Sequence, residues 1–442
     1  MDNDKQSSQV FENLLFPKIF QTFRMSIQPT KLIIAFLALA IICLIGWVMD
    51  FSGTVVVTQN TQGKIVDTEL AIYIDSPDLV QSYIEMHKGN GGRRGVFSTV
   101  WRFAATKFQG AVNSVFAFNI PGVATNIAEY FKAITWVLKY HFIYCIIFFV
   151  MKLAVISLAG GAICRIAALQ FARGEKPGLT EAARFSAKKF MSFFTAPLTP
   201  VAIIIFIGVF VFLLGLIGNI PRVGELIMGI FMPLALIAGS LIAVVLIGAV
   251  AGFNLMFPAV VYDGSDCFDA VSRSFSYVYS RPWRMGFYTA VAAVYGAICY
   301  MFVRFFAFLL LIVTYGLLDI GVFNEAGGAG KLVRIWAKPE FFNLLGRNAD
   351  VSMNWAEGIT AYLIYLFLLV VVGLVVSFII SFYFSANTII YSLMRNKVDD
   401  TALEDIYTYS EEVQTEPAIT ESESEESQPT PEEQSDSPSS TE

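Results

Sequence analysis

The stretch VAIIIFIGVFVFLLGLIG, residues 201–218, contains no charged or polar side chain. An α-helix of about 20 apolar residues crosses a hydrocarbon core of about 30 Å, so this stretch predicts a transmembrane helix. Five more runs are long and apolar enough for the same prediction, and they cover Leu32–Met49, Phe142–Cys164, Leu226–Val261, Gly286–Leu318 and residues 359–390. Residues 226–261 and 286–318 exceed one crossing, which predicts tilt, a break or extension past the bilayer.

The composition of the whole chain also indicates a membrane protein. Of its 442 residues 56% are hydrophobic and 15% are charged, and the mean hydropathy is +0.62. A soluble domain averages about 45–50% apolar and about 25% charged residues. We therefore expect an all-α, polytopic protein of the cell membrane with about six transmembrane helices. No basic domain or nucleic-acid reader motif is present, so we expect no nucleic-acid partner.

Charge and hydropathy divide the chain into three parts. Residues 398–442 hold 15 acidic residues and no Lys or Arg, whereas the preceding 397 residues have a net charge of +9. So acidic a segment cannot bury enough apolar surface to fold, which predicts a disordered tail. Residues 32–397 form the membrane domain. Residues 1–31 form an N-terminal segment, in which residues 10–23 predict a short amphipathic helix that lies either in the lipid headgroups or against the protein.

Lys and Arg in short loops predict the orientation of the spans. The loop after the second span holds six basic residues, and the loop after the fourth holds Arg273, Arg281 and Arg284. The turn between the third and fourth spans holds only Arg222. Both basic loops are therefore expected in the cytoplasm, and six spans place both termini there as well.

The segment of about residues 50–139 is then external. Within it VFSTVWRFAATKFQGAVNSVF, residues 96–116, carries an apolar stripe at helical spacing. We expect an amphipathic helix on the membrane surface or on neighbouring spans. The preceding GTVVVTQNTQGKIVD, residues 53–67, is too short to predict a folded domain.

Two short stretches between spans share a pattern, GLTEAARFSAKKF at residues 178–190 and CFDAVSRSFSYV at residues 267–278. An offset of 88 residues aligns three pairs, which are Glu181 with Asp269, Ala182 with Ala270, and Ser186 with Ser274. Each stretch predicts a short amphipathic helix between an incoming and an outgoing span, with Thr180 or Ser265 as the expected N-cap. Such a parallel repeat is one interpretation, and a chance match of three residues is the other.

The longer stretches ARGEKPGLTEAARFSAKKF and PAVVYDGSDCFDAVSRSFSYVYSRPWR resemble a broad group of bacterial polytopic membrane proteins. This group includes the membrane domain attached to some glycerophosphodiester phosphodiesterases. The matching positions in the second stretch are Asp263, Asp269, Ala270, Arg273 and Ser274. The resemblance covers about residues 134–395 and implies the polytopic fold. Because no soluble phosphodiesterase domain is present, it does not imply that activity.

Lys152 and Arg304 are cations inside predicted spans. Intramembrane charges are costly and are candidates for a functional site, and no Asp or Glu in the middle of a span offers them a partner. One hypothesis is that both line a groove that binds an anion such as a lipid phosphate. The other is that the helices tilt or extend so that both side chains reach an interface.

Small residues predict close helix packing in two spans. Gly248 and Gly252 form a GxxxG pattern in the fourth span, and the last span carries a small-residue face made of Gly373, Ser377, Ser381 and Ser385. Hydroxyl groups on this face also suit an ion path, but no acid lies near them to support one.

The sequence offers little for catalysis or metal binding. The five cysteines include no CxxC pair, and His87 and His141 are single, with no paired carboxylates or nucleophile arrangement around them. No nucleotide-binding, hydrolase or metalloprotease fingerprint is present, so we expect no enzyme, cofactor or metal. The leading hypothesis is a non-enzymatic protein of envelope or membrane organisation that acts through lipids, protein partners or self-association. The alternative is a transporter or lipid-handling protein that uses Lys152 and Arg304.

Overall fold

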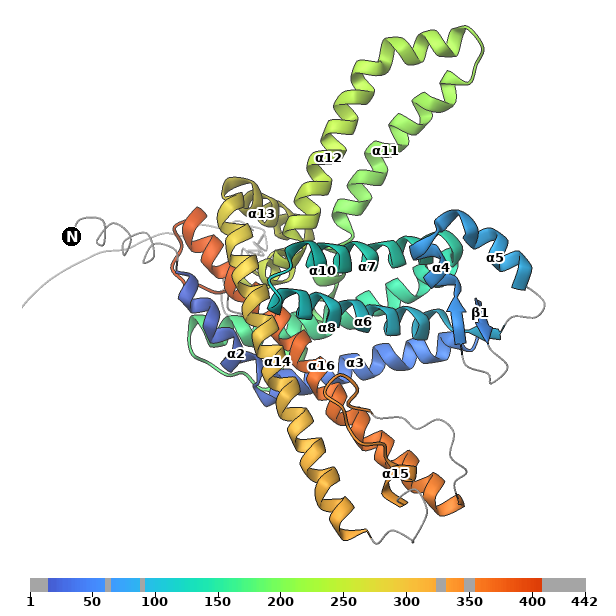
Figure 1. Ribbon diagram of the computed structural model, residues 1–442. Helices are drawn as coiled ribbons and strands as arrows, with labels where there is room; N and C mark the ends of the chain where they lie inside the picture. The colour runs from blue at the N-terminus through green and yellow to red at the C-terminus, as the bar shows by residue number, and fades with distance from the viewer. Residues whose placement is uncertain (1–14, 60–64, 88–91, 323–330, 346–353, 408–442) are drawn as a thin grey trace, which may run out of the picture. The chain divides into compact units, whose positions relative to one another are not determined.

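The computed structural model describes residues 15–59, 65–87, 92–322, 331–345 and 354–407 (Figure 1). In this part of the chain six helices are long and apolar enough to cross a membrane, and they are α3 (Pro29–Asp50), α8 (Phe142–Ala172), α11 (Thr199–Gly218), α12 (Val223–Asp263), α14 (Pro282–Gly321) and α16 (Trp355–Val398). The expected class of a multi-pass, helical membrane protein is therefore confirmed. The three longest helices have 40 to 44 residues, about twice the length of one crossing.

Spans α3, α8, α12 and α16 pack together through one apolar core. Their ends converge on one side, where the Nζ atom of Lys31 in α3 lies 3.0 Å from Oε1 of Gln170 in α8. Helices α9 (Leu179–Lys188) and α13 (Cys267–Ser280) lie on this side, which we call the helix side. Because α3 begins and α16 ends here, the first and last spans have their outer termini on the same side of the protein.

The N-terminal segment packs against the protein over its described part. A 3₁₀ helix η1 (Phe16–Phe20) leads into α2 (Gln21–Ser26), and both contact α16. Ile19 and Met25 are buried, and the Ser381 hydroxyl donates to the Ser26 carbonyl at 2.9 Å. Residues 10–14 of the predicted amphipathic helix lie outside the described residues.

The opposite ends of α3 and α8 carry a small sheet, so we call this the sheet side. Its strands are β1 (Val55–Gln59), β2 (Ile65–Thr68) and β3 (Gly92–Arg94), in the antiparallel order β2-β1-β3. Three short helices follow β2 in the sequence, and they are α4 (Glu69–Asp75), η2 (Pro77–Leu79) and α5 (Val80–His87). Residues 53–67 were expected to be too short for a folded domain; the described part of this stretch contributes strands to the sheet, and Val55 and Val57 are buried in one apolar cluster with Trp136 of a later helix.

That later helix, α7 (Ile120–Tyr140), forms a hairpin with α6 (Val96–Phe116). The amphipathic helix predicted for residues 96–116 is therefore confirmed, and it packs on α3 and α14. The second helix of the hairpin was not predicted. The short helices α10 (Phe190–Thr195) and α15 (Lys331–Ile335) complete the described elements.

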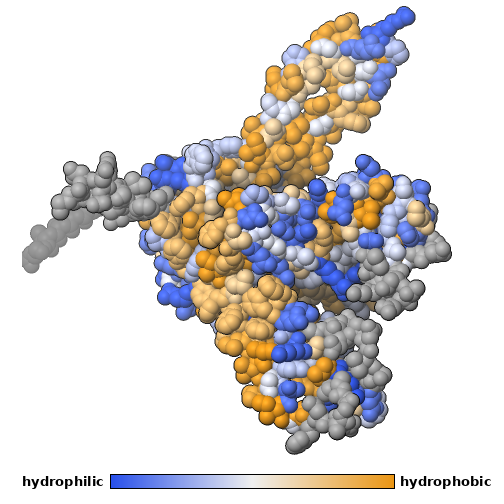
Figure 2. Space-filling view, viewed as in Figure 1, coloured by the Kyte–Doolittle hydropathy of each residue, from blue (hydrophilic) through white to orange (hydrophobic). Residues whose placement is uncertain are grey.

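Spans α11 and α12 lie side by side and are joined by a tight turn at Arg222 (Figure 1). None of the residues in the most apolar stretch of either helix is buried within the chain. Apolar side chains cover the visible surface of this hairpin, and polar ones gather at its tip (Figure 2). The predicted disordered tail comprises residues 398–442. Residues 398–407 are described, and Ile406 is buried in the apolar core, so the expectation of disorder does not hold there; residues 408–442 lie outside the described residues.

Candidate functional site

The first repeat helix, α9, packs back on the span that precedes it. Ala182 and Ser186 are fully buried, whereas Glu181 is exposed. The Ser186 hydroxyl donates to the Leu158 carbonyl of α8 at 2.6 Å. A side chain at Gly161 of α8 would lie 2.5 Å from that hydroxyl oxygen, so the glycine allows the close approach.

The second repeat helix, α13, occupies the equivalent place after α12. Ala270 and Ser274 are fully buried, and Ser274 packs near Gly252 of α12. Gly248 of the same span faces the ring of Phe275, so the predicted GxxxG pair contacts α13. The two helices thus share one mode of packing, while the repeat itself stays a prediction.

The predicted N-caps of these helices were wrong. Helix α9 begins after Gly178, with no side-chain cap, and α13 begins after Asp266, whose carboxylate accepts from the Asp269 N–H at 2.9 Å. Asp266 is the better cap because its position directly precedes the helix, whereas Ser265 is one residue too early. Asp269 instead pairs with Arg273 one turn later, at 3.0 Å.

A cluster of charged and phenolic side chains joins α13 to the helix-side ends of α12 and α16. We call it the span-end cluster; its members are Asp263, Arg273, Tyr277, Tyr391 and Arg395. Asp263 Oδ1 lies 3.2 Å from Arg395 Nε as an ion pair, and the Tyr391 hydroxyl donates to Asp263 Oδ2. The Asp263 side chain is 5% exposed and that of Arg395 11% exposed.

The segment after α16 completes the span-end cluster. The Arg395 guanidinium donates to the carboxylate of Asp405 at 2.9 Å and to the backbone carbonyl of Asp405 at 2.7 Å. The Tyr277 hydroxyl donates to Asp399 at 2.5 Å. Burial raises the pKa of the Tyr277 phenol well above its usual range, and the bond to Asp399 raises it further, so this phenol keeps its proton at neutral pH.

The span-end cluster fixes helix ends rather than offering a reactive group. Its carboxylates accept from arginine and tyrosine, so Asp263 and Asp405 are neutralised by partners within the protein. Asp263 was predicted only through the resemblance, Arg273 through the resemblance and the charge of its loop, and Arg395 and Tyr391 were not predicted. Their positions carried a signal, because both lie in the last two turns of α16, which ends on the same side as Asp263.

Arg304 lies on α14 and is 6% exposed. Its Nε donates to the Phe341 carbonyl at 2.9 Å, and its Nη1 donates to the Tyr300 hydroxyl. Its guanidinium carbon lies 5.5 Å from the ring centre of Phe341 and 5.8 Å from that of Phe342. The expectation that Arg304 lacks a partner was therefore wrong, because the segment between α14 and α16 folds back onto it.

Lys152 lies on α8 and is partly buried. No hydrogen bond or ion pair joins it to any residue that the structure describes. Arg304 contacts Tyr300, Phe341 and Phe342, so Lys152 and Arg304 share no partner among the described residues. The anion-site hypothesis for this pair stays a prediction.

The small-residue face of the last span contacts α2 and α3. Gly373 faces the Phe36 ring of α3, where an added side chain would lie 2.7 Å away. Ser377 donates to the Gly373 carbonyl at 2.7 Å, and Ser381 reaches Ser26. The hydroxyl of Ser385 is buried without a partner among the described residues.

A second polar cluster lies on the sheet side. Glu69 is 2% exposed, and its carboxylate accepts from Trp136 Nε1 at 3.2 Å and from the Val56 N–H at 3.3 Å. His141 Nε2 lies 3.6 Å from the same carboxylate, and Thr54 bonds its Nδ1. His141 was expected to stand without a carboxylate, and the fold supplies one from 72 residues earlier in the chain.

No family model, curated protein or solved structure matches this chain. The resemblance to the bacterial membrane group therefore stays a prediction on the quoted residues.

Proposed function

We propose that this chain is a non-enzymatic integral membrane protein that organises the envelope of a bacterial cell through contacts with other membrane proteins. The observation that carries the proposal is the α11–α12 hairpin. The most apolar stretches of both helices bury no residue within the chain, and large side chains such as Phe206, Phe210 and Phe212 are more than half exposed. Two spans so poorly covered by their own chain offer a continuous face to the helices of another membrane protein.

The charged clusters support the same proposal. The span-end cluster and the Glu69 cluster each join several elements, and their ionised groups have partners within the protein. A catalytic site needs a nucleophile or an acid and base free to meet a substrate. Neither cluster offers such a group, which favours a structural role.

We also propose that the helix side faces the cytoplasm. Exposed basic side chains surround α9 and the start of α14, at Arg173, Lys176, Arg184 and Arg281. Lys and Arg accumulate in cytoplasmic loops. Cysteine labelling from outside the cell tests this assignment at two exposed positions, Lys176 and Asp78. Labelling at 78 and protection at 176 are expected, and the reverse pattern would overturn the orientation.

A photo-crosslinking amino acid at Phe212 tests the function, with Val260, a buried residue of α12, as the matched control position. In intact cell membranes we expect a discrete protein adduct at 212 and none at 260. The adduct should disappear when the partner found at 212 is deleted, and envelope integrity should fall in the same strain. Adducts with lipid alone at 212 would contradict action through partners.

The lipid-handling alternative keeps one observation in its favour: Lys152 in α8 has no hydrogen-bond or ion-pair partner in the part of the chain that the structure describes. It requires that reconstituted protein moves an anionic lipid across a vesicle bilayer. It also requires that Lys152→Met abolishes this movement while the protein remains folded.

A further inference from the structure

The α6–α7 hairpin is fixed at both of its ends on the sheet side. The carboxylate of Asp50, the last residue of α3, accepts from the Phe97 and Ser98 N–H groups at 2.8 Å each, at the start of α6. At its other end α7 places Trp136 against Glu69. The base of the hairpin is therefore held where α3 leaves the membrane and α8 enters it.

From this base the hairpin runs back along the membrane spans. Helix α6 contacts α3 and α14, and α7 contacts α8 (Figure 1). The Phe108 ring lies 5.2 Å from that of Tyr300 in the middle of α14, and Val112 is buried in the same apolar cluster. Each helix has 21 residues, so the hairpin is about 30 Å long, close to the thickness of a hydrocarbon core.

Charge is confined to the half of the hairpin nearest the sheet. Residues 108–128 contain no Asp, Glu, Lys or Arg. Directly at the boundary of this uncharged half, Lys107 of α6 and Glu129 of α7 form an ion pair between the helices. The exposed Arg102 and Lys132 lie on the basal side of that pair. This distribution of charge is expected of a hairpin whose far half, residues 108–128, lies outside water.

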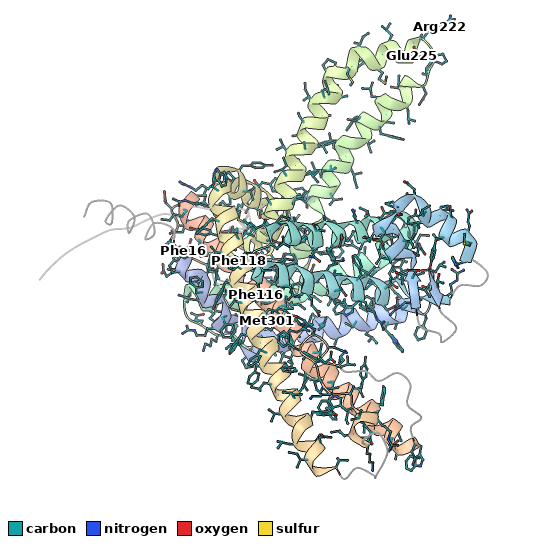
Figure 3. All side chains as sticks on the ribbon, in the orientation of Figure 1. Phe16, Phe116, Phe118, Arg222, Glu225 and Met301 are labelled. Atoms are coloured by element: carbon teal, nitrogen blue, oxygen red, sulfur yellow. The ribbon has the colours of Figure 1, made fainter. Side chains whose placement is uncertain are left out.

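The tip of the hairpin is apolar and exposed. Phe118 is 94% exposed and Ile120 80% exposed, and Phe116 beside them is 44% exposed (Figure 3). The backbone of the turn is nevertheless hydrogen-bonded: the Phe118 N–H donates to Val115, and the Asn119 side chain accepts from the Gly122 N–H at 3.0 Å. Because an unsatisfied backbone group in hydrocarbon costs several kcal/mol, these hydrogen bonds lower the cost of placing the turn in lipid.

We propose that residues 108–128 form a re-entrant hairpin inserted among the acyl chains of the lipid bilayer from the sheet side, with the Lys107–Glu129 pair near its headgroup boundary. In water the side chains of Phe118 and Ile120 would be almost fully solvated, and exposed apolar surface costs about 25 cal/mol per Å². Among acyl chains the same side chains are solvated favourably, and the paired charges stay where water reaches them. The sheet is thereby held down on the membrane at a point separate from α3 and α8.

Spin labels at single cysteines test the insertion. In a cysteine-free background, Phe118→Cys reports on the tip and Lys132→Cys, an exposed position near the base, is the control. After reconstitution in phosphatidylcholine vesicles, relaxation by oxygen, which concentrates in acyl chains, is compared with relaxation by a water-soluble nickel chelate. We expect oxygen to dominate at 118 and nickel to dominate at 132.

Nickel access at 118 equal to that at 132 would show that the tip lies in water, and access by neither probe would show that protein covers it. Either result overturns the proposal. Because Cys164 and Cys299 are buried and their replacement can impair folding, a benzophenone amino acid at 118 in the otherwise unchanged chain gives a second measurement. Lipid adducts are expected there, and peptide adducts alone contradict the insertion. Neither result depends on the function proposed above.

Discussion

The ion pair between Asp263 and Arg395 gives a sharp test of how the helix side is held together. The change is Asp263→Asn, which keeps the shape of the side chain and removes its charge. Breaking a buried ion pair by removing one partner costs about 3–5 kcal/mol, because the remaining charge is left uncompensated. Arg395 keeps its bonds to Asp405, so we expect a loss at the lower end, about 3 kcal/mol.

The matched control is Asp269→Asn on the neighbouring helix. The Asp269 side chain is 44% exposed and pairs with Arg273 one helical turn away. Pairs of this kind contribute about 0.3–0.5 kcal/mol, so the control should unfold almost like the wild type. The two variants therefore differ in burial and in partners but carry the same chemical change.

The free energy of unfolding is measured by titrating the detergent-solubilised protein with sodium dodecyl sulfate and following tryptophan fluorescence. The further variant Arg395→Met, alone and combined with Asp263→Asn, completes a double-mutant cycle. We expect a coupling energy of about 1–3 kcal/mol, since contacting charges in one network are not additive. If Asp263→Asn loses no more stability than Asp269→Asn, the span-end cluster does not stabilise the fold, and the reasoning from burial is refuted.

Two further predictions concern the cations and the C-terminal segment. Arg304→Met should lower the free energy of unfolding by about 2 kcal/mol, because it removes charged hydrogen bonds, while Lys152→Met should be neutral or stabilising in the same titration. If Arg304→Met lost no more stability than Lys152→Met, the contacts of Arg304 would be weak. Truncation after Lys397 should destabilise the protein, because it removes Asp405, the partner of Arg395. Truncation after Tyr407 keeps Asp405 and should not destabilise it. The thermal unfolding midpoints of the two truncated proteins are compared, and equal midpoints contradict the prediction.

The spans could be predicted from sequence because hydropathy is a local property. Residues 201–218 need no partner to be recognised as a crossing, and the stripe of residues 96–116 is equally local. The contacts between distant residues could not be predicted. Trp136 and Val55 share one apolar cluster across 81 positions. Arg304 bonds the Phe341 carbonyl and the Tyr300 hydroxyl, which are uncharged, so no charge pattern marks its partners.

The candidate site lies between these two cases. Asp263 and Arg395 each stand at the end of a span, and a six-span topology already places those ends on one side. A search for opposite charges at converging helix ends would therefore have found the pair, whereas a search for acids in the middle of spans did not. Tyr391 and Tyr277 would still have been missed, because a phenol in an apolar run is ordinarily a packing residue.

The distribution of these contacts separates the spans into two kinds. Spans α3, α8 and α16 are fixed by polar contacts near their ends, at Asp50, Gln170 and Arg395, and they share one apolar core. In the α11–α12 hairpin the polar contacts with other elements that the structure describes lie in the second half of α12. They run from Val244, whose carbonyl accepts from the Tyr279 hydroxyl at 2.5 Å, to Asp263, which pairs with Arg395. In a bilayer the hydrophobic effect does not drive helices together, so a helix pair without polar or close-packed contacts gains little from its own chain. Beyond their contact with each other, the most apolar stretches of α11 and α12 meet lipid or another protein, and a crosslinker at Phe212 discriminates between the two.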